Sequence, residues 1–274
     1  MKIAGHTMGT PELDIFESIN LFSRLGFDGI EIRSSPEGQL DLSEGGLKFN
    51  RATEDFCARI KKAASDACLE IVCLSAYAGD FRKESVAEAH RREIRHSVDV
   101  AASLGCPMVR VMGGACSSFW DGAKSRSESA RITAKNLNEL ATYAGTKEVE
   151  LVVETHAGTL AESAVLARKL MDLTASPHIG VIYDQDQIDR CEGEGPTESV
   201  ELLAPYIRHV HLCPFKFNTR GCPERTSEIL VALKKINYEG YLSAEYPRHG
   251  NSELPPAHEA MKHDLDFLRE LLSK

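Results

Sequence analysis

The sequence predicts an α/β protein with one domain, a (β/α)8 TIM barrel of parallel strands that spans residues 1–274. Three observations lead to this prediction. Apolar runs typical of strands recur roughly every 30 residues, and amphipathic stretches separate them. Their strict alternation implies parallel strands joined by right-handed crossovers, and eight such units close a barrel. The length of 274 residues also suits this fold, which typically needs about 250.

Eight strands are expected at the short apolar runs, which occupy residues 2–6, 28–33, 70–75, 107–112, 149–154, 178–183, 207–212 and 240–245. Helices are expected to follow them at residues 12–25, 51–67, 84–104, 126–144, 159–173, 197–204, 223–236 and 256–272. In the third helix, Ile94 and Val98 fall at helical spacing, and Leu265 and Leu268 do the same in the last.

The connections differ at the two ends of the predicted strands. Links from helix to strand are short and carry a glycine where a helix C-cap favours a left-handed residue, at Gly26, Gly105 and Gly145. Links from strand to helix are long, at residues 33–50, 113–125, 184–196, 213–222 and 246–255. This asymmetry is typical of a barrel whose site lies at the carboxyl ends of its strands. An open doubly wound sheet is the alternative, but the AGHTMGTPE segment lacks the GxGxxG pattern of that fold.

The composition is that of a soluble globular chain, with 42% apolar and 27% charged residues. The net charge is −9 and basic blocks are absent, which argues against nucleic-acid or membrane partners. No apolar run reaches the roughly 18 residues that a membrane span needs. The start MKIAGHTMGT has no apolar signal region, and the eight cysteines form no CxxC pair. Reduced, buried thiols and a cytoplasmic location are therefore expected.

Ionisable residues stand at the carboxyl ends of the last four predicted strands. They are Glu154, Asp184, His211 and Glu245. The strand ends of a closed barrel lie on one rim, so these side chains are able to converge. Three carboxylates in contact cannot all stay ionised without a cation. Oxygen donors with one imidazole favour a divalent metal ion, Mn²⁺ first, with Mg²⁺, Zn²⁺ or Co²⁺ as alternatives.

Further polar and aromatic residues are expected to face a substrate at the same rim. They are His6, Arg110, Trp120, His156, Lys216, Arg248 and His249. The alternative for the loop cations is plain solvent exposure, and Trp120 either covers a sugar or plugs the barrel mouth. His209 shares a strand face with His211 and lies deeper; it either orients a ligand or is a satisfied core histidine, and the second interpretation is favoured. Glu31 and Arg33 end the second strand on one face, and no role is assigned to them.

The segments VVETH, YDQDQ, HVHLC and SAEYP resemble the xylose-isomerase-like TIM-barrel superfamily, the sugar phosphate isomerase/epimerase family that also includes endonuclease IV. The resemblance runs from GFDGIEI (26–32) to GYLSAEYP (240–247). In the ketose 3-epimerases of this family, four strand-end residues bind the metal. Carried over, the metal ligands are Glu154, Asp184, His211 and Glu245. The resemblance also implies that Glu154 and Glu245 are catalytic and move the proton.

The chain departs from the family pattern at positions that orient the substrate. Gln187 stands where many relatives have a histidine after the Asp of the sixth strand. Phe217 stands where the epimerases commonly have a basic residue, with Lys216 beside it. Gly158 and Leu160 occupy a loop that is acidic in those epimerases. The metal set is unaffected, whereas the acidic net charge and Gln187 argue against the DNA-cleaving branch.

The resemblance implies a divalent-metal-dependent isomerase or epimerase of a keto- or aldo-sugar, or of a related hydroxycarbonyl compound. A proton would move through a metal-stabilised enediolate. The alternative is a metal-dependent dehydratase of the same superfamily, such as an inosose or dehydroshikimate dehydratase, with His156 or His249 as the acid. A non-catalytic sugar-binding barrel is the third hypothesis. Relatives often form dimers or tetramers, so the resemblance is compatible with a homo-oligomer.

Overall fold

The structure, a computed structural model, describes residues 1–35, 47–48, 52–114, 125–213, 223–246 and 255–274. The barrel strands in these ranges are β1 (Lys2–His6), β2 (Gly29–Ser35), β4 (Glu70–Ser75), β5 (Met108–Met112), β6 (Glu150–Glu154), β7 (Ile179–Asp184), β8 (Ile207–Leu212) and β9 (Tyr241–Ala244). These eight strands are parallel and follow the order β1-β9-β8-β7-β6-β5-β4-β2, and the pairing of β1 with β2 closes the barrel. The predicted fold class is therefore confirmed.

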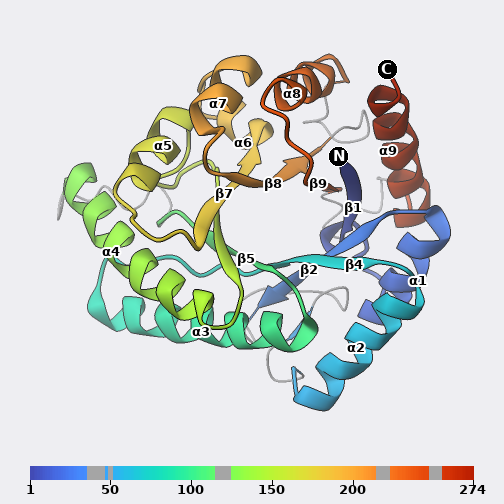
Figure 1. Cartoon of the computed structure of the whole chain (residues 1–274), viewed down its shortest axis with the longest axis horizontal. Coiled ribbons are helices and arrows are strands. Elements are labelled where there is room, and N and C mark those ends of the chain that lie inside the picture. The colour runs from blue at the N-terminus through green and yellow to red at the C-terminus, as the bar shows by residue number, and fades with distance from the viewer. Residues whose placement is uncertain (36–46, 49–51, 115–124, 214–222, 247–254) are drawn as a thin grey trace.

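The helices form a ring around the strands (Figure 1). They are α1 (Ile15–Leu25), α2 (Glu54–Asp66), α3 (Glu84–Leu104), α4 (Arg126–Gly145), α5 (Ala164–Asp172), α6 (Gln185–Asp189), α7 (Pro196–Leu203), α8 (Pro223–Lys235) and α9 (Ala257–Leu272). Buried side chains such as Phe22, Leu137 and Leu265 fill the layer between helices and strands. Helix α1 begins later than predicted because Asp14 and Glu17 form a capping box at its N-terminus.

The barrel interior has an apolar layer below a polar one. A small apolar cluster inside the strands consists of Ala4, Val72, Cys73, Val152 and Ile182. Side chains alternate along a strand, so the residues two positions later, including His6, Glu154 and Asp184, point the same way. The polar layer therefore lies at the carboxyl rim, where the sequence predicts the site.

Three short elements are absent from the sequence prediction. They are the 3₁₀ helix η1 (Thr7–Gly9), the two-residue strand β3 (Leu47–Lys48) and helix α6. Helix α6 begins directly after Asp184, whose carboxylate accepts a hydrogen bond from the backbone N–H of Gln187. Such brief segments carry too few residues to show a hydrophobic period.

The glycine prediction holds at two of its three positions. Gly26 and Gly105 are left-handed, with φ of 94° and 71°. Gly145 is not among the glycines with positive φ, so the prediction is wrong there. Gly145 instead leaves room for the ring of His178, whose Cδ2 atom would lie 2.3 Å from a Cβ at that position.

The cysteines of the described ranges are all free thiols. Cys57, Cys73 and Cys106 are buried, as expected. Cys68 is exposed, which contradicts the expectation, because it lies in the turn between α2 and β4 with a φ of 55°. Cys191 and Cys213, which follows β8, are half-buried.

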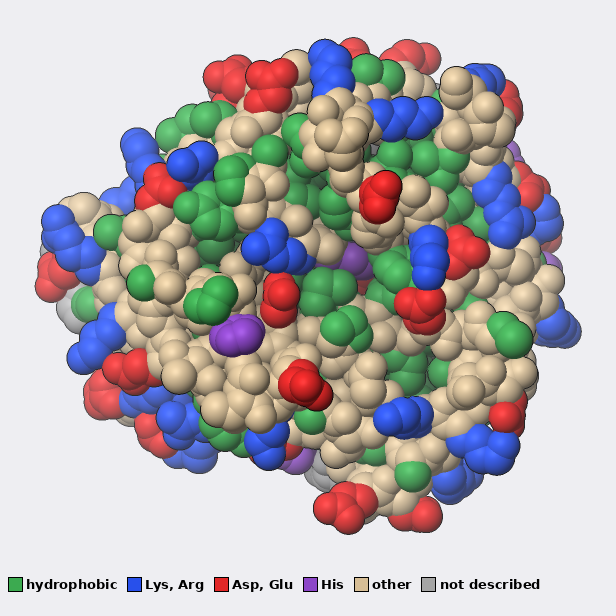
Figure 2. Space-filling model, in the orientation of Figure 1, with side chains coloured by type: hydrophobic (Ala, Val, Ile, Leu, Met, Phe, Trp, Pro, Cys, Tyr) green, Lys and Arg blue, Asp and Glu red, His purple; other side chains and the backbone are tan. Residues whose placement is uncertain are grey.

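The outer surface mixes charges of both signs. Figure 2 shows acidic and basic side chains interspersed over the face that it presents. None of the helices in the described ranges combines the length and the apolar character that crossing a bilayer requires.

The tight contact at Gly79 predicts a measurable loss of stability on substitution. A Cβ there would lie 2.2 Å from the carbonyl oxygen of Met112 at the end of β5, and backbone cannot move aside as a side chain can. Gly79→Ala should therefore lower the free energy of unfolding by about 1–3 kcal/mol, measured by urea denaturation. Gly195→Ala is the matched control, since nothing lies within 4 Å of its added methyl group. Equal stability of the two variants would contradict the packing at Gly79.

Asp264 predicts a pH dependence of stability. It lies on the buried face of α9, neither carboxyl oxygen has a hydrogen-bond partner among the described residues, and burial raises its pKa well above 3.8. The unfolded chain then ionises at a lower pH than the folded one, so stability is lost as pH rises from about 4 toward the raised pKa. Asp264→Asn should flatten this decline and stabilise the protein at pH 7 by roughly 1 kcal/mol or more. Thermal unfolding between pH 4 and 8 tests this, and parallel curves for both proteins would contradict it.

Candidate functional site

The parallel register brings the predicted metal ligands to one rim. Asp184 on β7 pairs with His211 on β8. Glu154 ends β6, and its neighbour on β7 lies two residues before Asp184. Glu245 follows the last residue of β9, and its backbone N–H donates to the carbonyl of Leu212 on β8 at 2.8 Å. Each of the four residues is at most 5% exposed.

His211 lies at the centre of this group. Its Nδ1 atom is 3.1 Å from Oε1 of Glu154 and 3.3 Å from Oε1 of Glu245. Donor atoms of Glu154, Asp184 and His211 all lie within 4.8 Å of one another, a group that is able to hold a metal ion. The four residues predicted from strands distant in the sequence are therefore neighbours in space.

The carboxylates of the group have unequal partners. Oε2 of Glu154 forms an ion pair with Nη1 of Arg110 at 3.0 Å. Oδ1 of Asp184 accepts a hydrogen bond from the backbone N–H of Gln187 at 3.3 Å. The buried Oδ2 of Asp184 has no hydrogen-bond partner in the described part of the chain. A buried carboxylate oxygen is costly to leave unpaired, and a bound cation would satisfy it.

Burial and neighbouring charges move the pKa values of these groups apart. Burial disfavours the Glu154 carboxylate, but Arg110 and His211 outweigh it and lower its pKa to about 2. Burial, with the charges of Glu245 and Glu154, raises the pKa of Asp184 well above its usual range. Burial also raises the pKa of Glu245. Burial opposes the charged ring of His211, yet the surrounding carboxylates raise its pKa well above the usual value.

The donor set fits a divalent cation. Three carboxylates and one imidazole supply hard oxygen atoms and one nitrogen, the mixture that Mn²⁺ and Mg²⁺ accept. A charge of +2 between these groups would replace the protons that Asp184 and His211 otherwise retain. The unpaired Oδ2 of Asp184 is the observation of the structure that most directly supports this fit.

Arg110 points into the barrel, a direction that the sequence leaves open. It is 3% exposed, its Nε donates to the carbonyl of Ala76 at 3.1 Å, and its guanidinium stacks 4.2 Å from the centre of the Tyr77 ring. Nη1 pairs with Glu154, whereas the buried Nη2 has no hydrogen-bond partner among the described residues. Arg110 therefore orients Glu154 and has one donor left at the site.

His6 and His156 also lie at this rim. Nδ1 of His6 accepts a hydrogen bond from the backbone N–H of Met8 at 2.9 Å, so Nε2 carries the proton of the neutral ring. That Nε2 lies 3.5 Å from Glu31 and 3.8 Å from Glu245. Nδ1 of the half-buried His156 lies 2.9 Å from the carbonyl of the next residue, and a carbonyl only accepts, so Nδ1 carries a hydrogen.

The remaining predicted substrate contacts lie outside the described residues. They are Trp120, Lys216, Arg248 and His249. Their expected roles stay predictions.

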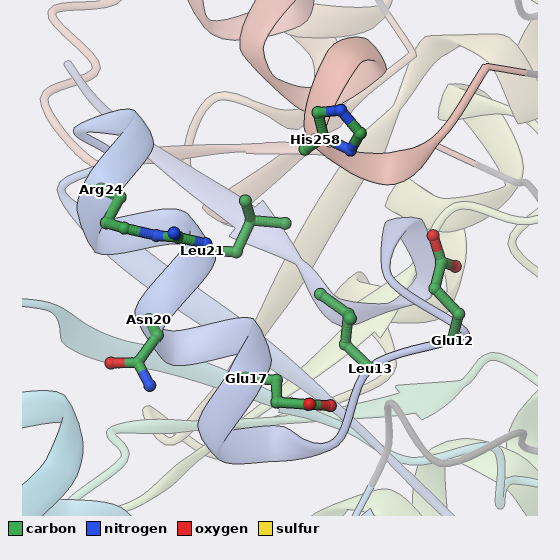
Figure 3. Close-up of a pocket in the computed structure, with 7 residues that line it drawn as sticks. All are labelled: Glu12, Leu13, Glu17, Asn20, Leu21, Arg24 and His258. Carbon is green, nitrogen blue, oxygen red and sulfur yellow. The ribbon is translucent and has the colours of Figure 1, made fainter.

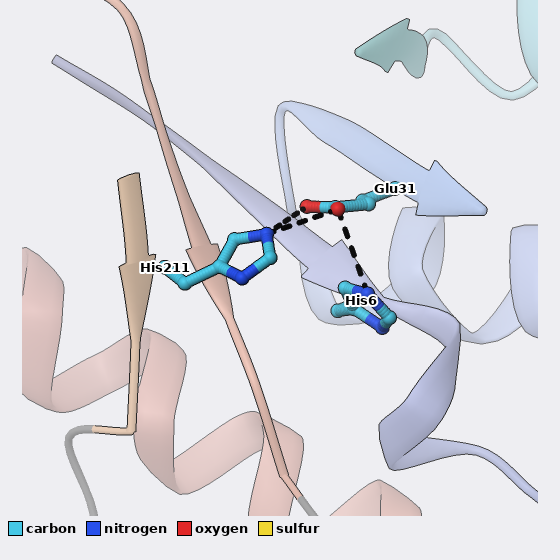
Figure 4. A group of neighbouring side chains, drawn as sticks. All are labelled: His6, Glu31 and His211. Carbon is cyan, nitrogen blue, oxygen red and sulfur yellow. Dashed lines mark hydrogen bonds and ion pairs between the residues drawn. The ribbon is translucent and has the colours of Figure 1, made fainter. Parts of the chain in front are cut away.

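Glu31 is the buried acid that the sequence analysis leaves without a role. It lies on β2, is fully buried and faces His211 and His6 (Figure 4). His6, Glu31 and His211 form a second group of possible ligands. The sequence does carry a signal that Glu31 belongs to a site. Its carboxylate interrupts the apolar run GIEI in the same way that Glu154 interrupts its own strand. His209 is fully buried, which agrees with its interpretation as a core histidine.

A separate surface pocket lies outside the barrel, beside α1 and the start of α9 (Figure 3). The residues that line it are Glu12, Leu13, Glu17, Asn20, Leu21, Arg24 and His258. None of them belongs to the group around His211. This pocket contains no buried cluster of donors, so it does not compete with the barrel rim as the candidate site.

The chain belongs to the xylose isomerase-like TIM barrel family, whose model matches residues 19–271. The resemblance drawn from the strand-end motifs is thereby confirmed. Among the solved structures of this fold are sugar epimerases and dehydratases.

Three relatives illustrate the range of the family. An inosose dehydratase of Clostridium perfringens is 26% identical over 234 residues, which cover 74% of this chain and 76% of that protein. D-psicose 3-epimerase from Clostridium cellulolyticum H10, solved with D-tagatose, has a TM-score of 0.81 at 14% identity, covering 99% of both chains. A probable 3-DHS dehydratase from Bacillus anthracis has a TM-score of 0.74 at 16% identity, covering 98% of this chain and 99% of that one. At these identities the two solved structures establish the fold.

The unpaired oxygen of Asp184 predicts a ligand-dependent stability. Mn²⁺ at 100 times its dissociation constant should stabilise the wild-type protein by about 2.7 kcal/mol and raise its melting temperature. Asp184→Asn should lose most of that increase, because it removes one of the charged donors. Asp264→Asn is the control, since it also neutralises a buried Asp but lies outside the group. A full Mn²⁺ response in Asp184→Asn would show that Asp184 is not a ligand.

Proposed function

We propose that this chain is a divalent-metal-dependent isomerase or epimerase of a small keto- or aldo-sugar, or of a related hydroxycarbonyl compound. The observation that carries the proposal is the convergence of three buried carboxylates, Glu154, Asp184 and Glu245, on the imidazole of His211. Membership of the xylose isomerase-like family supports an enzyme. The names of the relatives, which are sugar epimerases and dehydratases, support a carbohydrate-like substrate.

The ion would be held by Glu154, Asp184, His211 and Glu245. Mn²⁺ is the proposed ion, with Mg²⁺, Zn²⁺ and Co²⁺ as alternatives. When bound, it supplies a positive charge that polarises the substrate carbonyl and makes the neighbouring C–H acidic. Because the four side chains are almost fully buried, they exclude water from the reacting atoms, and charge interactions there are stronger than in solvent.

Glu154 and Glu245 are the proposed proton carriers. They come from β6 and β9 and flank the same imidazole, with one oxygen of each within 3.3 Å of Nδ1 of His211. Arg110 holds the second oxygen of Glu154 and keeps that carboxyl ionised, as a base must be. If one carboxylate takes and returns the proton on a single face, the product is an isomer. If the two act on opposite faces, the product is an epimer.

A dehydratase of the same family is the second candidate, and two observations favour it. The curated relative with 26% identity over 234 residues is named inosose dehydratase. A β-hydroxyl that leaves as water needs a proton, and the protonated imidazole of His156, two residues beyond Glu154, would donate it from Nε2 while Nδ1 stays bonded to the carbonyl of the next residue. Proton removal from carbon is common to both reactions, so the assignment of Glu154 and Glu245 is the same in each.

Glu154→Gln and Glu245→Gln should each lower turnover by about 10²-fold or more, because each replaces a proton-carrying carboxylate by an amide of the same shape. The assay incubates Mn²⁺-loaded protein with keto-sugars and inososes in D₂O. Deuterium at the carbon beside the carbonyl is followed by NMR, and the product by mass. A product that has lost one water identifies a dehydratase, whereas an isomer or epimer retains the atoms of that water.

Glu93→Gln is the matched control for these variants. Glu93 lies on α3 and is not part of the group around His211. It too is a partly buried carboxyl group, and burial raises its pKa to about 7. This variant should retain wild-type turnover. Near-normal activity of Glu154→Gln or Glu245→Gln would refute the role of that residue. Substrate binding with neither deuterium uptake nor loss of water would instead support a non-catalytic barrel.

A further inference from the structure

Glu31 is the most heavily bonded acid in the described part of the barrel interior. Its carboxylate accepts hydrogen bonds from the hydroxyl of Ser75, from Nε2 of His209 at 2.9 Å and from Nε2 of His211 at 3.0 Å. Glu31, Ser75 and His209 are all fully buried. None of these three residues belongs to the ligand group, yet they lie directly behind its imidazole.

The contacts of Glu31 decide which nitrogen of His211 faces the ligand group. A carboxylate only accepts, so the Nε2 atom that it contacts carries a hydrogen. Nδ1 also faces carboxylates, at 3.1 Å from Glu154 and 3.3 Å from Glu245, so it carries a hydrogen in the metal-free ring. A bound cation would replace that hydrogen, and the lone pair of Nδ1 would then face the ion while Nε2–H stays with Glu31. Only that lone pair is able to bind a metal ion at the carboxylate group. Ser75 fixes Glu31 from the neighbouring strand β4, and His209 fixes it from β8 across the barrel interior.

We infer that Glu31 is a positioning residue for the candidate metal centre: it holds the Nε2–H of His211 and so presents Nδ1 to the ion. This inference rests on the proposed function, and it assigns a role to a residue that does not itself touch the ion. Carboxylate partners of this kind fix the orientation of metal-binding histidines and increase their basicity. The geometry in Figure 4 has this arrangement, with the Glu31 carboxylate facing the side of the His211 ring away from Nδ1.

The competing interpretation makes Glu31 a ligand of a second ion, together with His6 and His211. The hydrogen bond from Met8 N–H to Nδ1 of His6 argues against it. A neutral His6 that accepts at Nδ1 has its proton on Nε2, the nitrogen that faces Glu31, and a protonated nitrogen cannot bind a metal. His211 would also have to lose the Nε2 proton that Glu31 accepts. Both rings therefore present a protonated nitrogen, and not a lone pair, toward Glu31.

The first experiment measures Mn²⁺ binding to the full chain by calorimetry. Glu31→Gln keeps the shape of the side chain but brings an amide donor toward rings that already donate to it. The dissociation constant for Mn²⁺ should rise about 10- to 100-fold. Glu93→Gln, a change of the same residue type on α3, should leave it unchanged. An unaltered constant in a folded Glu31→Gln protein would overturn the inference.

Ser75→Ala provides a second variant in case Glu31→Gln does not fold. It removes one donor to Glu31 and leaves both Glu31 and His211 in place, so a smaller, several-fold weakening of Mn²⁺ binding is expected. Unchanged Mn²⁺ affinity would count against the inference. If wild-type protein binds two ions tightly and Glu31→Gln loses one, Glu31 is a ligand and the positioning role is wrong.

The second experiment identifies the protonated nitrogen directly. Long-range ¹H–¹⁵N spectra of wild-type protein, labelled at histidine and loaded with Zn²⁺, should show the His211 proton on Nε2. A proton on Nδ1 would overturn the inference. Wild-type protein that binds neither Mn²⁺ nor Zn²⁺ would refute the proposed function, whereas normal binding that is insensitive to Glu31 would refute only the positioning role.

Discussion

The imidazole of His211 lies between two sets of carboxylates, and the rest of the site is arranged around it. On one side Nε2 meets Glu31, and on the other Nδ1 meets Glu154 and Glu245. All of these groups are buried, so none is able to exchange its partner for water. An imidazole suits this position because it is able to donate from both nitrogens to the two sets of carboxylates, or to release the proton of Nδ1 to a cation while Nε2 still donates to Glu31.

Among the described residues, the barrel interior holds more buried carboxyl groups than cations. Arg110 neutralises Glu154, and protons on Asp184 and His211 reduce the charge further. The remaining carboxyl groups lie at the rim, where Oδ2 of Asp184 has no hydrogen-bond partner among the described residues. A fold built for stability alone would place apolar side chains there, as the layer around Val152 does. The cost of burying these acids is therefore best explained by a ligand that uses them.

Much of this arrangement is readable in the sequence because parallel strands end at a common rim. Glu154 and Asp184 each interrupt an apolar run, and this interruption is visible in the sequence even where the predicted strand boundaries are wrong. Glu31 interrupts such a run too, but on the second strand, and nothing in the sequence connects it with His211. Arg110 has the same limitation, since a single polar residue in a strand does not show which face it occupies. The prediction at Gly145 failed for a different reason. This glycine makes room for the ring of His178 and does not provide a left-handed backbone.

The sequence by itself determined the alternation of strands and helices, the closed barrel and the four strand-end residues, because these depend on hydrophobic period and chain order alone. The tertiary structure decided the side-chain pairings between strands, Glu31 on β2 with His211 on β8 and Arg110 on β5 with Glu154 on β6. The geometry of these contacts depends on barrel closure and on the direction of each side chain. Neither quantity has a local signature, so only the folded chain shows which nitrogen of His211 faces the carboxylates.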